Sequence, residues 1–109
     1  ALKHLANVVR DTLRPTDSLA RYGGEEFVIL LPDTTPEDGE KVMIRVQREL
    51  TKRFFLHNNE RVLITFSAGI AARKPDEPQE ALIERADRAM YLAKQAGKNR
   101  VQRAEDDAV

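Results

Sequence analysis

Two adjacent glycines, Gly23 and Gly24, stand just ahead of an uninterrupted apolar run at residues 27–31. Glycine adopts positive φ without steric cost, so a Gly-Gly pair suits both central positions of a two-residue hairpin turn. We therefore expect residues 18–22 and 27–31 to pair as the two strands of a hairpin. An apolar run of this kind is typical of a strand buried on both faces, and such a strand needs a sheet covered by helices.

Two glutamates, Glu25 and Glu26, separate the glycines from the apolar run. The simplest explanation from the residues alone is that both carboxylates are solvated turn residues. A second explanation is a ligand site, in which the glycines let the backbone approach a phosphate group and a carboxylate holds Mg²⁺ against the phosphate oxygens. The local pattern leaves both explanations open.

Hydrophobic spacing predicts three helices, at residues 1–13, 36–52 and 79–95. The second has the clearest start, because Thr35 is a suitable N-cap and Pro36 suits the first helical position. Further strands are expected at residues 54–56, 61–71 and 99–102. The longest of these alternates with a period of two, which is typical of a central strand. The order of elements predicts an α+β fold, a sheet with helices packed on it.

Composition limits the kinds of function that are open to the chain. Its 109 residues include 18 basic and 18 acidic ones, so no net charge attracts it to a nucleic acid polymer or an anionic membrane. It contains no cysteine, which excludes disulfides and thiolate metal sites and is typical of a cytoplasmic protein. The apolar run at residues 27–31 is the longest, and it is far too short to span a membrane. A parent protein could still be tethered to a membrane elsewhere in its chain.

Two further motifs lie at either side of the glycines in the sequence. Arg14 and Asp17 form an Arg-x-x-Asp pattern just before the first predicted strand, and an arginine fork beside a carboxylate suits a guanine or phosphate group. Lys94 and Lys98 lie at the end of the third predicted helix, where cations also complement the helix dipole without any ligand. Each motif taken alone is weak evidence for a binding site.

Together the motifs carry a resemblance to a known family. Residues 21–27 read Arg-Tyr-Gly-Gly-Glu-Glu-Phe, residues 91–94 read Tyr-Leu-Ala-Lys, and residues 97–99 read Gly-Lys-Asn. In this register, and with the Arg-x-x-Asp pattern, the sequence resembles the GGDEF-domain diguanylate cyclases, in the GGEEF form of their signature. The resemblance implies a ferredoxin-like, palm-type sheet of the nucleotide-cyclase kind, with the signature on a hairpin at the active site.

The resemblance also implies an activity. Diguanylate cyclases condense two GTP molecules into cyclic di-GMP, with Mg²⁺ or Mn²⁺ as cofactor, and two protomers meet face to face as a homodimer. By this resemblance, Gly23 and Gly24 bind substrate by letting the backbone approach the nucleotide. Glu25 is then a metal ligand, and Glu26 contacts the metal or assists in activating the attacking hydroxyl.

Other positions receive roles by the same resemblance. Lys94 and Lys98 correspond to basic residues that hold the triphosphate of the substrate GTP. Arg14 and Asp17 correspond to an inhibitory site that binds the product cyclic di-GMP, with Asp17 accepting a hydrogen bond from the guanine edge. Arg45, on the second predicted helix, corresponds to a further arginine of that allosteric site.

Members of the family carry an N-terminal strand with a metal-binding aspartate, and a segment with Asn and Asp that reads guanine, ahead of the part that this sequence resembles. We therefore expect a partial domain at residues 1–103, with the N-terminal strand and helix missing, and a disordered acidic tail at residues 104–109. Such a fragment alone is expected to be inactive. Its parent protein is expected to carry an upstream sensory or receiver domain.

Two other hypotheses stay open beside the enzyme. A receptor that binds cyclic di-GMP or GTP without turnover would keep Arg14 and Asp17 and lose catalytic residues, whereas the intact Glu25 and Glu26 favour an enzyme. A structural or dimerising domain would bind no nucleotide. An upstream metal-binding aspartate would favour the enzyme, and its loss would favour the receptor.

Overall fold

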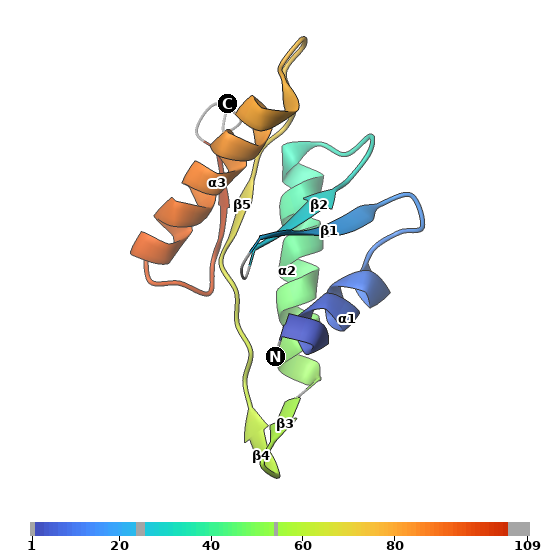
Figure 1. The fold of residues 1–109 in the computed structure, drawn as a ribbon, viewed down its shortest axis with the longest axis vertical. Coiled ribbons are helices and arrows are strands. Elements are labelled where there is room, and N and C mark those ends of the chain that lie inside the picture. Colours follow the sequence, from blue (N-terminus) through green and yellow to red (C-terminus); the bar gives the residue numbers. More distant parts are fainter. Residues whose placement is uncertain (1, 24–25, 54, 105–109) are drawn as a thin grey trace. The chain divides into compact units, whose positions relative to one another are not determined.

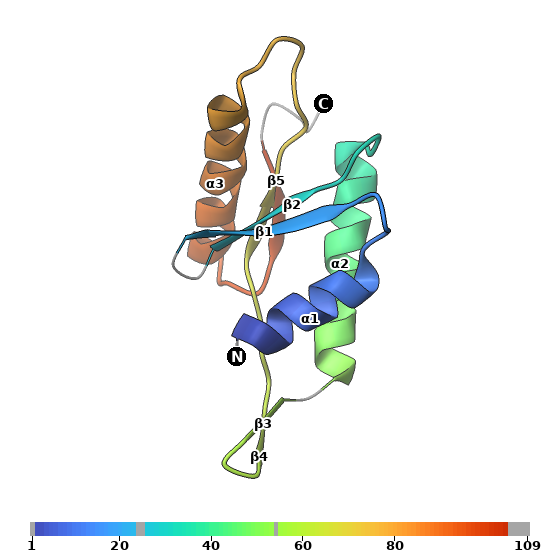
Figure 2. The same cartoon turned by 45° about the vertical axis from the view of Figure 1, so that its right-hand side comes forward.

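The computed structural model describes residues 2–23, 26–53 and 55–104 of the chain. Helices and strands follow one another through the sequence, which agrees with the predicted α+β class (Figures 1 and 2). The elements are α1 (Leu2–Thr12), β1 (Ser18–Gly23), β2 (Glu26–Leu30), α2 (Pro36–Lys52), β3 (Phe55–His57), β4 (Glu60–Val62), β5 (Ala68–Ile70), α3 (Gln79–Gln95) and β6 (Val101–Arg103).

The chain divides into two compact units. The first unit comprises Ala1–Thr34 and Arg45–Ile64, and the second comprises Thr35–Ile44 and Thr65–Val109. The hairpins β1–β2 and β3–β4 belong to the first unit, whereas the pair β5–β6 and the helix α3 belong to the second. Helix α2 contributes residues to both.

In the first unit, β1 and β2 pair antiparallel, as the two glycines predicted. Ser18 lies opposite Leu30, and the register shifts between Arg21 and Gly23. The expectation that β2 is buried on both faces is wrong, because its central residues are only partly buried and Leu30 is 54% exposed. The physical reason is that β1 is the only strand paired with β2 in the part of the chain described.

Helices α1 and α2 follow the spacing of their apolar residues. The buried hydrophobic side chains are Ala6, Val8 and Val9 in α1 and Met43, Val46 and Leu50 in α2. The predicted N-cap of α2 is confirmed, because the Thr35 hydroxyl oxygen accepts the backbone N–H of Asp38 at 3.1 Å. Arg53, just beyond α2, forms an ion pair with Asp11 of α1 at 2.6 Å, so it joins the two helices within the first unit.

In the second unit, α3 packs against the parallel pair formed by β5 and β6 (Figures 1 and 2). Two alanines on the inner face of α3, Ala89 and Ala93, are buried. Ala104 is buried as well, and its backbone N–H donates to the carbonyl of Ile70 at 2.8 Å. The expectation of a disordered tail is therefore wrong for Ala104, and residues 105–109 lie outside the described residues.

The prediction of a long central strand at residues 61–71 is also wrong. The structure has two short strands there, β4 and β5, with no strand at residues 63–67. Those five residues have no ladder partner in the described part of the chain, and an alternating pattern forms a strand only where a neighbour takes up its backbone N–H and C=O groups. Leu63 accordingly is 67% exposed.

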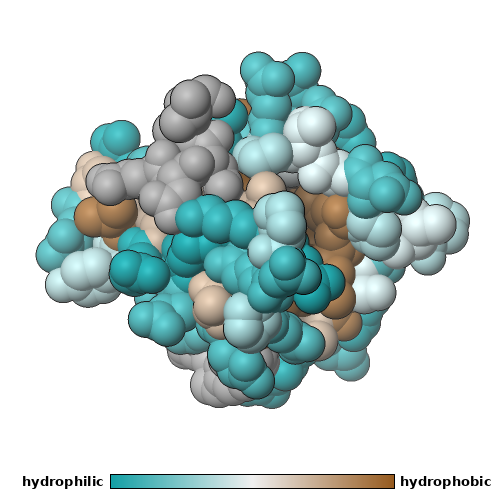
Figure 3. All heavy atoms as spheres, turned by 90° about the horizontal axis from the view of Figure 1, so that it is seen from above, coloured by the Kyte–Doolittle hydropathy of each residue, from teal (hydrophilic) through white to brown (hydrophobic). Residues whose placement is uncertain are grey.

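The surface is mainly polar on the face drawn in Figure 3, with hydrophobic residues visible between hydrophilic ones. The exposed large hydrophobic side chains among the described residues are Leu30, Leu56, Val62, Leu63, Tyr91 and Leu92. Within the described ranges, no helix combines the length and the hydropathy that crossing a membrane requires.

Candidate functional site

The first candidate site is the tip of the β1–β2 hairpin. Gly23 ends β1 and lies opposite Glu26, which begins β2. Glu26 is exposed, so its carboxylate is accessible to a ligand. Gly24 and Glu25 lie outside the described residues. The register of the two strands shifts between Arg21 and Gly23, next to the tip.

The second candidate site is the C-terminal end of α3. Lys94 lies in the last turn and is exposed, and Lys98 follows the helix and is exposed as well. Gly97 has φ 125°, where a side chain is strained, and Lys98 and Asn99 continue with positive φ. The N–H of Lys98 donates to the carbonyl of Ala93 at 3.1 Å, which closes the helix and places both lysines at its end.

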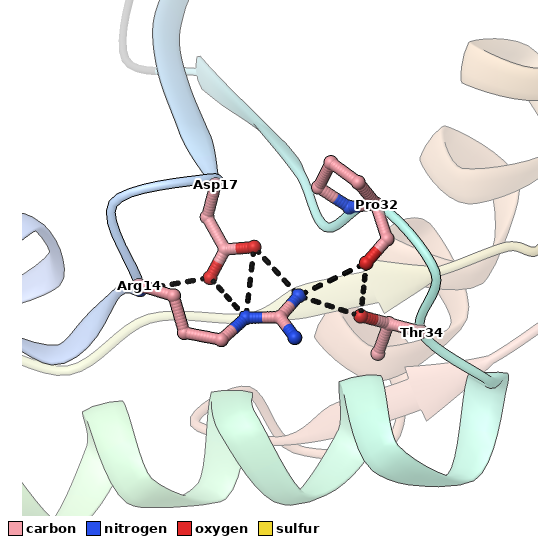
Figure 4. A network of polar contacts seen from close by, with 4 residues as sticks. All are labelled: Arg14, Asp17, Pro32 and Thr34. Atoms are coloured by element: carbon pink, nitrogen blue, oxygen red, sulfur yellow. Dashed lines mark hydrogen bonds and ion pairs between the residues drawn. The ribbon is translucent and has the colours of Figure 1, made fainter.

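The third candidate site is the turn between α1 and β1, where the structure brings Arg14 and Asp17 together (Figure 4). Arg14 Nη2 lies 2.8 Å from Asp17 Oδ1, and Arg14 Nε lies 3.2 and 3.1 Å from the two carboxylate oxygens. The backbone N–H of Arg14 also donates to Asp17 Oδ2 at 2.9 Å. The Arg-x-x-Asp pattern is therefore a formed, two-pronged ion pair.

The electrostatics of this pair follow from its hydrogen bonds. The side-chain hydrogen bond from Arg14 lowers the pKa of Asp17, and the same bond raises the pKa of Arg14. The side chain of Asp17 is 1% exposed, whereas that of Arg14 is 53% exposed. Asp17 thus lies inside the turn, and Arg14 is the member of the pair that a ligand can reach.

Two further groups hold the Arg14 guanidinium from the loop after β2 (Figure 4). Arg14 Nη2 donates to the carbonyl oxygen of Pro32 at 3.0 Å and to Thr34 Oγ1 at 2.9 Å. The sequence analysis missed both groups. No local signal points to them, because they lie 18 and 20 residues from Arg14 in the sequence.

Comparison with known proteins decides the family. The family model described as diguanylate cyclase, GGDEF domain, matches residues 1–100. The chain belongs to the GGDEF family. It is 45% identical to the diguanylate cyclase DgcP of Pseudomonas aeruginosa over 101 residues, which cover 93% of this chain and 15% of that protein. The chain thus spans less than a sixth of this relative's length.

Solved GGDEF structures match the fold. The GGDEF domain of DgcB from Caulobacter crescentus, in complex with c-di-GMP, superposes with a TM-score of 0.88 at 36% identity and covers 95% of this chain and 63% of that one. The active GGEEF domain of a diguanylate cyclase from Vibrio cholerae superposes with a TM-score of 0.80 at 27% identity, covering 95% of this chain and 66% of that one. These likenesses confirm the predicted α+β, nucleotide-cyclase-like fold class.

GGDEF diguanylate cyclases generally depend on a divalent metal, and the acidic end of the hairpin is the place where one would bind. Carboxylate oxygens are donors that Mg²⁺ prefers, and proteins usually hold it with one or two carboxylates together with substrate phosphates. Glu26 offers one accessible carboxylate. Across the described ranges, no group of three or more acidic, histidine or cysteine side chains is placed to hold a metal. The described part of the hairpin thus offers one carboxylate that suits such an ion.

Arg45, the third residue expected at the inhibitory site, lies on α2 in the first unit. It is exposed, and it has no ion-pair partner among the residues that the structure describes. Its guanidinium is therefore accessible to solvent, and its place in an inhibitory site stays a prediction.

The second unit contains a buried ion pair that the sequence did not predict. Arg85 of α3 donates from Nε and Nη2 to the two carboxylate oxygens of Glu77, each at 2.8 Å, and from Nη2 to the carbonyl of Ala72. The side chains of Arg85 and Glu77 are 8% and 10% exposed. The hydrogen bonds from Arg85, followed by that from the Lys74 backbone N–H, lower the pKa of Glu77 to about 2. The pair fixes the loop before α3 onto that helix.

Proposed function

We propose that the full-length protein that carries this chain is a diguanylate cyclase, which condenses two GTP molecules into cyclic di-GMP. The observation that carries the proposal is the unbroken Gly-Gly-Glu-Glu signature at residues 23–26, in a chain that matches the GGDEF family over residues 1–100. Its first and last residues, Gly23 and Glu26, lie opposite each other in the β1–β2 pair. Two protomers of the protein meet face to face, so that each presents one GTP to the other. The substrate, the product and the homodimer are parts of this proposal.

The reaction assigned to the hairpin is nucleotidyl transfer. The 3′-oxygen of each GTP attacks the α-phosphorus of the other. At each α-phosphorus the bond to the oxygen that bridges to the β-phosphorus breaks, so two pyrophosphates leave and the ring closes. Mg²⁺, or Mn²⁺, supplies positive charge against the phosphate oxygens. Glu25 would hold this ion, and Glu26 would contact it or accept the proton of the attacking hydroxyl. Gly23 and Gly24 leave room for the nucleotide beside the backbone.

Lys94 and Lys98 are assigned to the triphosphate. Both are exposed at the end of α3, and each carries a strongly solvated point charge that can bind phosphate oxygens. Their charges offset the negative charge that builds up on the leaving pyrophosphate.

We further propose that the product inhibits the enzyme at Arg14 and Asp17, with Arg45 as a further contact. The exposed Arg14 guanidinium and the unpaired Arg45 support this assignment among the described residues. Because β1 follows directly on the turn that holds Arg14, product bound there can fix the orientation of the hairpin or link two domains in an unproductive arrangement. Inhibition is then non-competitive with GTP.

The first test measures synthesis of cyclic di-GMP from GTP and Mg²⁺ by the full-length protein and its Glu25→Gln variant. The substitution removes a carboxylate charge at nearly constant volume, and we expect the rate to fall about a hundredfold or more. Glu60→Gln, at an exposed position of β4, is the matched control and should keep the rate. A Glu25→Gln variant with the original rate would remove Glu25 from the mechanism. Binding of nucleotide without any synthesis would instead indicate a receptor.

The second test titrates cyclic di-GMP into the full-length protein and its Arg14→Ala variant by calorimetry. Loss of a charge-assisted, forked contact should weaken product binding about ten- to a hundredfold. Equal affinities in the two proteins would contradict the inhibitory-site assignment. Initial rates measured alongside show whether Arg14 also takes part in catalysis or folding.

A further inference from the structure

The hydrogen bonds of Arg14 divide its guanidinium into a held edge and an open edge. Nε and Nη2 make all of its side-chain hydrogen bonds, to Asp17 and to the loop after β2 (Figure 4). Nη1 has no partner among the described residues. A ligand that binds Arg14 in this arrangement therefore binds at Nη1. Because the guanidinium is planar and rigid, the hydrogen bonds at Nε and Nη2 also fix the direction of Nη1.

Thr34 holds that edge from the side opposite Asp17 (Figure 4). Its hydroxyl accepts from Arg14 Nη2 at 2.9 Å and donates to the carbonyl of Pro32, also at 2.9 Å. The Pro32 carbonyl in turn accepts from the same Nη2 at 3.0 Å. Nη2, the Thr34 hydroxyl and the Pro32 carbonyl thus form a closed triangle of hydrogen bonds, and Thr34 is the only side chain in it besides that of Arg14.

This use of Thr34 is not explained by the start of the following helix. The N-cap of α2 is the next residue, Thr35, whose hydroxyl takes the Asp38 N–H. The Thr34 hydroxyl makes no helix-capping bond and is directed to Arg14 and Pro32. If Thr34 served only to close its own turn, its hydrogen bond to the Pro32 carbonyl would be sufficient. The bond to Arg14 is therefore additional to the turn.

We propose that Thr34 is a positioning residue that orients Arg14 for an acceptor-rich, anionic ligand. The proposal rests on the proposed function, in which that ligand is cyclic di-GMP. An arginine side chain loses conformational entropy when a ligand fixes it in one rotamer. A residue that already holds the arginine in that rotamer reduces the entropy lost on binding. Asp17 anchors one side of the fork, and Thr34 prevents the guanidinium from turning about that anchor.

The test is a calorimetric titration of cyclic di-GMP into the full-length protein and three variants. Thr34→Val removes the hydroxyl at constant shape and should weaken binding about two- to tenfold, the effect expected of one neutral hydrogen bond. Thr34→Ser keeps the hydroxyl and should restore the affinity. Thr51→Val is the matched control, because the Thr51 hydroxyl bonds only to the helix carbonyl of Gln47, and it should bind as the original protein does.

A second readout needs no ligand. Thr34→Val should increase the fast motion of the Arg14 Nε–H group in ¹⁵N relaxation measurements, whereas Thr34→Ser should leave it unchanged. Unchanged affinity and unchanged motion in Thr34→Val would overturn the role of Thr34, while a loss of binding in Arg14→Ala would leave the proposed function standing. Failure of the original protein to bind cyclic di-GMP would overturn both the inhibitory site and the role of Thr34, whereas synthesis of cyclic di-GMP is tested separately by the rate assay.

Discussion

Gly69 of β5 lies directly against the backbone of Ala86 in α3. A Cβ atom at position 69 would stand 1.9 Å from the Ala86 carbonyl oxygen and 2.4 Å from the backbone nitrogen of Met90. Neither obstacle is the end of a flexible side chain, so only a shift of the helix or the strand could make room. Strand and helix approach this closely only because residue 69 has no side chain.

Gly69→Ala should therefore destabilise the protein. Overpacking of a well-packed interior costs about 1 to 3 kcal/mol, and a clash with backbone should reach the upper end of that range. Chemical unfolding measures the change in the free energy of unfolding. Gly97→Ala is the comparison, because only the flexible Arg100 side chain lies near its Cβ position, at 3.4 Å, and its cost comes from φ 125°. Equal destabilisation by the two variants would contradict the close packing of β5 on α3.

A second prediction concerns acid stability and the Glu77–Arg85 pair. Glu77 has a pKa of about 2 in the folded protein against an ordinary value of 4.5. A carboxyl with a lowered pKa adds stability that is fully present above its unfolded pKa and is lost as the pH falls through the folded one. The contribution of Glu77 should thus be complete above pH 4.5 and disappear towards pH 2.

Glu77→Gln tests this window. At neutral pH the variant should unfold at a lower denaturant concentration than the original protein, because Arg85 keeps a buried charge without its ionised partner. The difference should shrink as the pH falls from 4.5 to 2. Glu84→Gln, at an exposed position of α3 next to Arg85, is the control and should show no such dependence. A constant difference across the window would mean that the Glu77 charge does not stabilise the fold.

The third prediction concerns Lys94 and Lys98. If both bind the GTP triphosphate, replacement of either by glutamine should lower kcat/KM for GTP about ten- to a hundredfold, the range for losing one charge-assisted hydrogen bond. Lys41→Gln is the control, since Lys41 is exposed on α2 and only pairs weakly with Asp38 at 3.9 Å. Full activity of both lysine variants would contradict triphosphate binding. The lysines would then serve only to complement the dipole of α3.

Local signals in the sequence were sufficient for the elements that depend on nearby residues. Thr35 and Pro36 set the start of α2, and the adjacent glycines predicted the β1–β2 hairpin. The strand predicted at residues 61–71 failed because a strand depends on a partner strand, which alternation along one segment cannot reveal.

The same limit applies to the candidate sites. Arg14 and Asp17 could be found because they are three residues apart, within one turn. The Pro32 and Thr34 contacts to Arg14 could not, because they depend on how the hairpin returns the chain to the first turn. Glu77 and Arg85 are eight residues apart, and their pairing depends on the path of the loop that precedes α3.

The last prediction separates two ways in which Asp17 can serve an inhibitory site. The sequence resemblance implies that Asp17 accepts a hydrogen bond from guanine. In the structure its side chain is 1% exposed, and both of its oxygens already accept from Arg14. Because its oxygens are already hydrogen-bonded to Arg14, Asp17 is expected to affect ligand binding indirectly, by orienting Arg14. Asp17→Asn, which turns an acceptor into a donor facing the guanidinium, should weaken binding of cyclic di-GMP about tenfold.

A double-mutant cycle decides between the two roles, because substitutions that act through the same contact are not additive. If Asp17 works through Arg14, the double variant Arg14→Ala, Asp17→Asn should bind cyclic di-GMP as weakly as Arg14→Ala alone and no more weakly. If Asp17 contacts guanine itself, the two losses should multiply. Calorimetric affinities of the full-length protein and the three variants give the answer. Multiplied losses would show that Asp17 leaves Arg14 when the product binds, and would contradict the role that the buried carboxylate indicates.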